Sequence, residues 1–134
     1  MNDKYASELP DAIIRKEILN TAIQYTCADR NSAYGPPEDN FEKIARRWTA
    51  HLENTFGANL KLTAEDVAIM MVDFKLARLE GNIDHKDSWI DAAGYIACGA
   101  GIALKNCKTF PANLGSLTGF TNKPYPPSLI PQPQ

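Results

Sequence analysis

Two aspartates, Asp87 and Asp91, lie one helical turn apart in "DHKDSWIDAAGYIACGAGIAL", residues 84–104, a stretch that is otherwise small and apolar after its first turn. Because an α-helix turns by about 100° per residue, both carboxylates fall on one arc, which also carries Cys98 and no further charge. An ionised carboxylate is costly to bury unless a cation or hydrogen-bond donors meet it. We therefore expect both aspartates to face the protein interior or a cavity.

The segment before this stretch carries the complementary charge. Asp66, Asp73 and Glu80 are spaced by seven residues and predict a solvent-facing strip of one helix. Lys75 and Arg78 fall instead on the broad apolar side of that helix, so they are expected to point inward. The few residues that join the two helices predict an antiparallel pair, in which these cations approach the two aspartates.

This arrangement has two readings. In the first it is architectural, a buried ionic network in which Asp87 also completes a capping box begun by Asp84. In the second, the aspartates hold a divalent cation while Lys75 and Arg78 receive a phosphorylated ligand. The second reading is chemically sound because Mg²⁺ takes oxygen ligands and commonly shares substrate phosphates.

Four residues upstream could extend such a site. Glu38 and Glu42 lie one turn apart at the edge of an apolar stripe and offer further metal ligands, although a solvated helix flank explains them equally well. In the loop "NSAYGPPEDNF", Tyr34 could stack on a base and Asn40 could read its edge. The same loop is also what a tight turn before a helix requires.

Hydrophobic periodicity and capping signals predict four helices, over residues 11–28, 37–53, 64–80 and 84–106. Pro37 opens the second helix. Thr63 and Asp66 form a capping box for the third, and Asp84 caps the fourth. No β pattern of useful length is present, so the expected fold class is all-α with a four-helix core.

The chain divides into a helical domain, residues 1–108, and a Pro-rich C-terminal arm, residues 109–134. The arm holds six prolines and several large apolar side chains. It is expected to be extended and packed on its own subunit or on a neighbour, with a disordered tail as the alternative.

The totals exclude several classes of protein. A net charge of −2 and a pI near 5.6 give no basic field for a DNA or RNA polymer. The N-terminus lacks the apolar core of a secretion signal and no apolar run could span a bilayer, so a cytoplasmic protein without membrane partners is expected. Three cysteines without a CxxC pair fit reduced thiols better than a disulfide framework or a zinc site.

The motifs "YGPPEDNFEKIARRW", "LTAEDVAIMMVDFKLARL" and "DHKDSWIDAAGYIACGA", within about residues 29–101, resemble a phage and prophage family of small helical proteins of uncertain function. More distantly, the layout resembles the MazG-like all-α nucleoside triphosphate pyrophosphohydrolases, whose fourth helix carries an acidic motif similar to "DSWIDAAGY". That resemblance implies helical dimers or tetramers in which carboxylate-bound Mg²⁺ activates water to cut the α–β phosphate bond.

Carried onto this chain, the MazG-like resemblance assigns the metal to four carboxylates, those of Asp87, Asp91, Glu38 and Glu42, the first three also being catalytic. It assigns substrate phosphates to Lys75 and Arg78. The chain departs from the family pattern because its third helix lacks the ExxE motif and its fourth-helix pair is DxxxD where the family has ExxD.

Three functions follow from this reading. The first is a nucleotide-binding homo-oligomer that hydrolyses a nucleoside triphosphate to the monophosphate and pyrophosphate with Mg²⁺. The second is a non-enzymatic protein that sequesters a nucleotide or a cyclic-nucleotide signal. The third is a structural or interaction protein that assembles through its C-terminal arm. A phage-encoded protein of any of these kinds would act in the host cytoplasm.

Overall fold

A computed structural model describes residues 10–27 and 35–105 of the chain. These residues form four helices and no strand: α1 (Pro10–Cys27), α3 (Pro37–Phe56), α4 (Ala64–Gly81) and α5 (Lys86–Leu104). The predicted all-α class and the four predicted helices are confirmed, with boundaries that differ by a few residues. The C-terminal arm, residues 109–134, lies outside the described residues. Its predicted packing and its predicted role in assembly therefore stay predictions.

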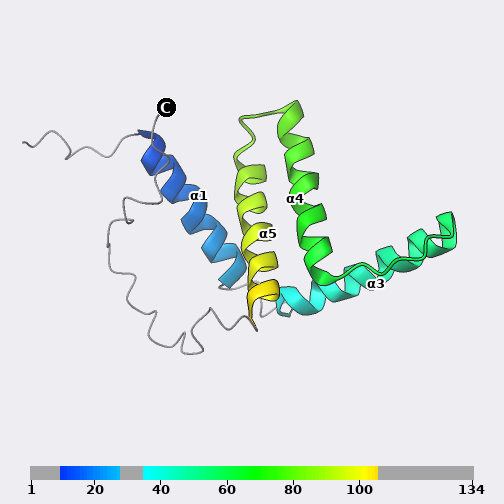
Figure 1. The fold of residues 1–134 in the computed structure, drawn as a ribbon. Helices are drawn as coiled ribbons and strands as arrows, with labels where there is room; N and C mark the ends of the chain where they lie inside the picture. Colours follow the sequence, from blue (N-terminus) through cyan, green and yellow to red (C-terminus); the bar gives the residue numbers. More distant parts are fainter. Residues whose placement is uncertain (1–9, 28–34, 106–134) are drawn as a thin grey trace, which may run out of the picture.

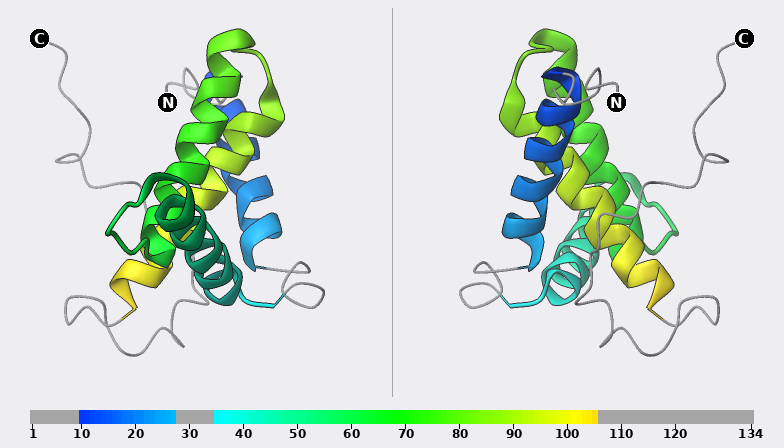
Figure 2. Two further views of the ribbon diagram at one scale, coloured as in Figure 1. Left: turned by 90° about the vertical axis from the view of Figure 1, so that its right-hand side faces the viewer. Right: turned by 90° about the vertical axis from the view of Figure 1, so that its left-hand side faces the viewer.

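Three of the helices lie side by side, with α5 between α1 and α4, while α3 crosses near one end and extends away from the others (Figure 1). Two views from the sides show the same arrangement (Figure 2). Helices α4 and α5 run antiparallel, as predicted, and are joined by a short turn. The expected four-helix core is thus an open layer of three helices, crossed at one end by the fourth.

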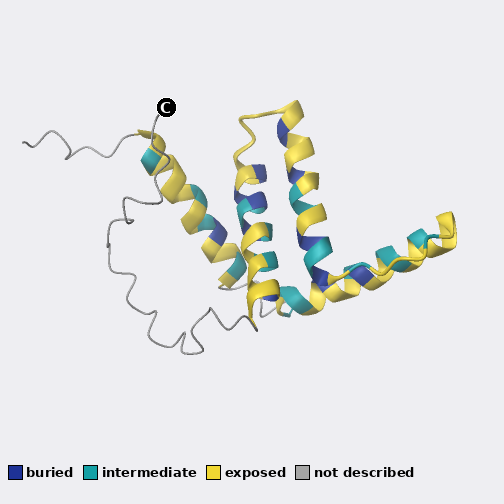
Figure 3. Ribbon diagram, in the orientation of Figure 1, coloured by how far each residue is buried: buried dark blue, intermediate teal, exposed yellow. Residues whose placement is uncertain are grey.

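The hydrophobic core lies where α3 crosses α4 and α5. Its buried members come from all three helices: Phe41, Ala45, Ala64, Val67, Ala68 and Ile102. Figure 3 shows these buried positions gathered at the facing sides of α4 and α5 and at the near end of α3, while most of α1 and the far end of α3 are exposed. The described part of the chain therefore buries a small core and leaves wide helical surfaces uncovered.

The termini of the helices follow from local chemistry. Pro37 opens α3, and Gly57 ends it in the left-handed conformation with φ of 63°, its N–H donating to the Glu53 carbonyl. The predicted capping box of α4 is confirmed: the Asp66 N–H donates to the Thr63 hydroxyl at 3.3 Å, and the Thr63 N–H donates to the Asp66 carboxylate at 2.8 Å.

The predicted cap of α5 is wrong. The N-cap is His85 and not Asp84, because the imidazole Nδ1 accepts the Ser88 N–H at 3.3 Å. Ser88, rather than Asp87, thus occupies the third position of the capped turn, and Asp87 has no capping role.

None of the helices in the described ranges is long and apolar enough to cross a membrane.

Candidate functional site

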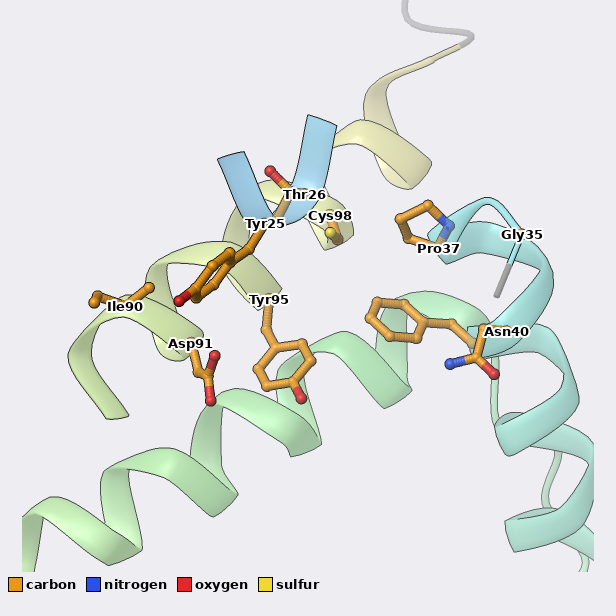
Figure 4. A pocket seen from close by; sticks show the side chains of 11 residues that line it. Tyr25, Thr26, Gly35, Pro37, Asn40, Ile90, Asp91, Tyr95 and Cys98 are labelled. Atoms are coloured by element: carbon orange, nitrogen blue, oxygen red, sulfur yellow. The ribbon is translucent and has the colours of Figure 1, made fainter. Parts of the chain in front are cut away.

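A cavity of about 370 Å³ opens between the end of α1, the beginning of α3 and the middle of α5 (Figure 4). It is lined by residues from these three segments: Tyr25, Thr26, Gly35, Pro37, Asn40, Phe41, Ile90, Asp91, Gly94, Tyr95 and Cys98. Its volume lies within the range of small-molecule sites, about 300–1,000 Å³. Tyr25 is 42% exposed and Asn40 is exposed, so the cavity opens to solvent.

Glycines and a proline shape this cavity. A Cβ placed on Gly94 would lie 3.3 Å from the Thr26 methyl, so the missing side chain allows the end of α1 to approach α5 closely. Gly35 has φ of 78°, a conformation that glycine adopts readily, and it turns the chain into α3 just before Pro37. Gly94 therefore permits the close contact between α1 and α5, and Gly35 permits the turn into α3.

Three aromatic side chains, Tyr25, Phe41 and Tyr95, contribute to the wall of the cavity. The Phe41 and Tyr95 rings pack with centroids 6.2 Å apart and planes tilted by 43°. In Figure 4, Tyr25, Tyr95 and Asp91 lie toward one end of the cavity, and Asn40 and Pro37 lie toward the other. The site thus combines ring surfaces with one carboxylate and one amide.

Asp91 meets the cation that the sequence predicted. Lys75 on α4 is buried, with 7% exposure, and its ammonium group contacts the Asp91 Oδ2 at 2.5 Å. The side chains of Lys75 and Asp91 are 9% and 20% exposed. The expected contact between the third and fourth helices is confirmed for this pair.

The orientation expected for the other two charges is wrong. Arg78 and Asp87 are both exposed. The Arg78 guanidinium lies over the Phe74 ring, 4.7 Å from its centroid, and that ring is itself exposed on the outer side of α4. Asp87 lies in the first turn of α5, where nothing in the described ranges covers it. The helical pattern gave the angular position of each residue on its own helix but could not show where the neighbouring helices end.

The remaining predicted site residues lie at different depths. Asn40 lines the cavity, Glu38 is partly buried in the first turn of α3, and Glu42 is exposed. Tyr34 lies outside the described residues. Within the described ranges, no three His, Cys, Asp or Glu side chains gather closely enough to hold a metal ion. The four carboxylates assigned to Mg²⁺ therefore do not form a cluster in this part of the chain.

Cys98 adds a thiol to the lining of the cavity. Burial raises the pKa of this thiol, and the nearby Cys27 thiol and Glu38 carboxylate raise it further. The thiol therefore stays protonated to higher pH than an ordinary cysteine.

The sequence did not identify the aromatic lining. Tyr25 and Phe41 lie in apolar helical stripes, a pattern that usually indicates core packing. Tyr95 and Cys98 share the helical arc of Asp91, and that shared arc was the available signal. It placed them beside the carboxylate but did not show that α1 and α3 leave a space in front of them.

The fold and cavity define an all-α protein with a site sized for a small molecule. The chain belongs to the family described as a domain of unknown function, DUF6378, which matches residues 17–103. It is similar to the Gene 55 protein of Mycobacterium phage D29, with 36% identity over 83 residues, which cover 62% of this chain and 51% of that protein. It is also similar to the Gene 55 protein of Mycobacterium phage L5, with 38% identity over 78 residues, which cover 58% of this chain and 47% of that protein.

These relatives support the expected resemblance to phage proteins of unknown function. The chain spans about half the length of the curated relatives that it matches. No solved structure matches the chain. The MazG-like resemblance, the nucleotide ligand and the cytoplasmic location stay predictions.

Proposed function

We propose that the chain binds a nucleoside or nucleotide through its base in the α1–α3–α5 cavity, and that it holds this ligand without hydrolysing it. The observation that carries the proposal is the lining of the cavity, in which three aromatic rings surround a space that also contains the Asp91 carboxylate and the Asn40 amide.

This lining suits a base. Aromatic side chains offer flat faces on which a base can stack, a contact worth about 1–3 kcal/mol per base. The Asn40 amide can both donate and accept hydrogen bonds, and the Asp91 carboxylate can accept them. Such groups, few in number and set in an apolar wall, are what orient a small ligand in its site.

The lining suits a phosphate less well. None of the described residues that line the cavity is a lysine or arginine. The Lys75 ammonium is already bound to Asp91, and Arg78 is exposed beside Phe74. Phosphoryl chemistry depends on cations placed against the charge that develops on the phosphate. Binding with the phosphates directed toward solvent therefore agrees better with these residues than hydrolysis does.

Mg²⁺-dependent hydrolysis is the second candidate, because Asp91 lines the cavity and Glu38 directly follows Pro37, another lining residue, in the first turn of α3. The described residues do not fit a preformed magnesium site, since Asp91 is paired with Lys75 while Asp87 and Glu42 are exposed. We therefore assign no chemical step to a metal ion held by these residues. The experiment below compares binding with and without Mg²⁺.

Thermal unfolding in the presence of nucleosides, monophosphates and triphosphates, each with and without Mg²⁺, tests the proposal. A ligand at about one hundred times its Kd stabilises the folded state by about 2.7 kcal/mol. We expect Tm to rise by several degrees with a nucleoside and with its nucleotides, without a need for Mg²⁺, and no pyrophosphate to be released.

Two asparagines on α3 provide a matched comparison. Asn40→Ala removes an amide from the cavity and should reduce the ligand-induced rise in Tm. Asn54→Ala removes an exposed amide near the other end of the same helix and should leave that rise intact. The proposal fails if no nucleoside or nucleotide raises Tm. Release of pyrophosphate from triphosphates only with Mg²⁺ would establish the hydrolase instead.

A further inference from the structure

We infer that the cavity selects guanine among the bases, because Asp91 presents a carboxylate oxygen whose orientation is held by a buried lysine. This inference rests on the proposed function, since it names the class of ligand that the same cavity takes.

The ion pair places the two oxygens of the Asp91 carboxylate in different environments. Oδ2 of Asp91 is bound by the Lys75 ammonium at 2.5 Å. Oδ1 has no hydrogen-bond partner within the described ranges, and those ranges hold no buried side-chain oxygen or nitrogen that lacks a partner. Oδ1 is therefore reached by solvent at a residue that lines the cavity.

Lys75 also sets the charge of this end of the cavity. The ammonium is buried between α4 and α5 and balances the carboxylate, so the pair as a whole is neutral. A neutral pair gives little attraction for a cationic ligand such as an amine. It does offer strong hydrogen-bond acceptors, because a carboxylate oxygen accepts bonds that are about twice as strong as those of a neutral group.

A carboxylate has about four acceptor positions and no donor. Lys75 uses one of them, which leaves room for two donors from a ligand. Among the common bases, guanine alone places two N–H donors, N1–H and the N2 amino group, next to each other on one edge. Adenine and cytosine place an amino group beside a ring nitrogen that is an acceptor, and uracil places its one N–H between two carbonyl oxygens.

The other bases therefore offer Asp91 one donor where guanine offers two, and an acceptor lies next to that donor. Two acceptors that face each other repel and leave the carboxylate oxygen without its bond to water, which is costly in a partly buried site. Because Lys75 is buried and bound to Oδ2, the Asp91 carboxylate cannot move away from such a base without breaking the ion pair. Selection thus comes from both the fit of guanine and the rejection of the other bases.

Calorimetric titration of the full chain with guanosine, inosine, adenosine, cytidine and uridine tests the inference. Inosine keeps N1–H and lacks the amino group, so it isolates one of the two hydrogen bonds. A hydrogen bond to a charged group corresponds to about ten-fold or more in affinity. We expect guanosine to bind about ten-fold more tightly than inosine. Its advantage in affinity over uridine should be larger than its advantage over inosine.

Two aspartates on α5 supply the variants. Asp91→Asn replaces a pure acceptor by an amide with a donor, so guanosine affinity should fall about ten-fold or more while adenosine affinity falls less. Asp87→Asn, an exposed position in the same helix, should leave every affinity unchanged. Circular dichroism checks that both variants fold. If Asp91→Asn does not fold, the comparison of guanosine with inosine in the natural chain tests the selection of guanine.

The outcomes separate the two proposals. If no nucleoside binds the natural chain, the proposed function fails. If nucleosides bind but guanosine has no advantage over inosine and adenosine, or if that advantage survives in Asp91→Asn, the selection of guanine is overturned while base binding stands.

Discussion

At the scale of single residues, two side chains on one arc of α5 have different environments. The Asp91 carboxylate has a cation against one oxygen and solvent at the other. Cys98 lies further along the same arc and is half-buried, and burial raises the pKa of its thiol. The cavity therefore has a hydrogen-bond acceptor at Asp91 and a protonated thiol at Cys98. The raised pKa of the thiol can be measured through its reactivity.

We expect the alkylation of Cys98 by iodoacetamide to rise with pH about a higher midpoint in the folded chain than in the chain unfolded in urea. Burial disfavours the thiolate, which is the reactive form, and the unfolded chain removes that burial. Peptide mass spectrometry after timed alkylation separates Cys98 from Cys27 and Cys107.

The raised pKa of Cys98 also determines how the free energy of unfolding depends on pH. Folding favours the protonated thiol, so the contribution of Cys98 to the free energy of unfolding is present below the ordinary thiol pKa. It is lost as pH rises through the raised value. An equal or lower alkylation midpoint in the folded chain would contradict the assignment.

At the scale of elements, α4 and α5 pack closely because α5 offers glycine where α4 approaches. A Cβ placed on Gly99 would lie only 2.8 Å from the Cβ of Ala68, which is a buried core residue. Neither atom belongs to a flexible side chain, so the two helices would have to move apart to admit another methyl group. The same close packing brings Lys75 to Asp91.

We expect Gly99→Ala to lower the free energy of unfolding by about 1–3 kcal/mol, because overpacking outweighs the higher helix propensity of alanine. Gly101→Ala is the matched control, since nothing lies within 4 Å of a Cβ placed there. It should raise the free energy of unfolding by about 0.5–1 kcal/mol. Urea denaturation measures both changes, and two stabilised variants would show that the α4–α5 contact is looser than described.

At the scale of the whole molecule, the four described helices leave some of their own apolar surface uncovered by one another. One stripe of α5, formed by Trp89, Ala93, Ile96 and Ala100 at helical spacing, has no charge, and its Trp89 and Ile96 are exposed by 44% and 59%. Since a second copy of the chain could cover this stripe, the predicted homo-oligomer agrees with the fold and stays a prediction.

We expect Ile96→Lys to lower the molar mass measured by light scattering, because a charge in the stripe would be desolvated in a dimer. Ile14→Lys, on α1 and with nearly the same exposure of 58%, should leave the mass unchanged. If the natural chain is monomeric at every concentration, or if both variants lower the mass equally, self-association through α5 is excluded.

The sequence by itself determined the elements and part of the site. Helical periodicity, Pro37 and the Thr63–Asp66 box gave the helices, since these signals act within one or two turns. The arc of each charge along α4 and α5 was enough to predict that Lys75 meets Asp91, because a short turn fixes how such helices pair.

The tertiary structure decided depth and neighbourhood. Arg78 and Asp87 lie on the arcs that the sequence assigned, yet both are exposed, because burial depends on where other helices pass and end. The cavity is likewise a product of packing between helices, since it exists only where Tyr25 and Asn40 are brought opposite Asp91, which lies far from both in the chain. Local chemistry sets the direction of a side chain along its own helix, whereas only packing between helices sets what that side chain faces.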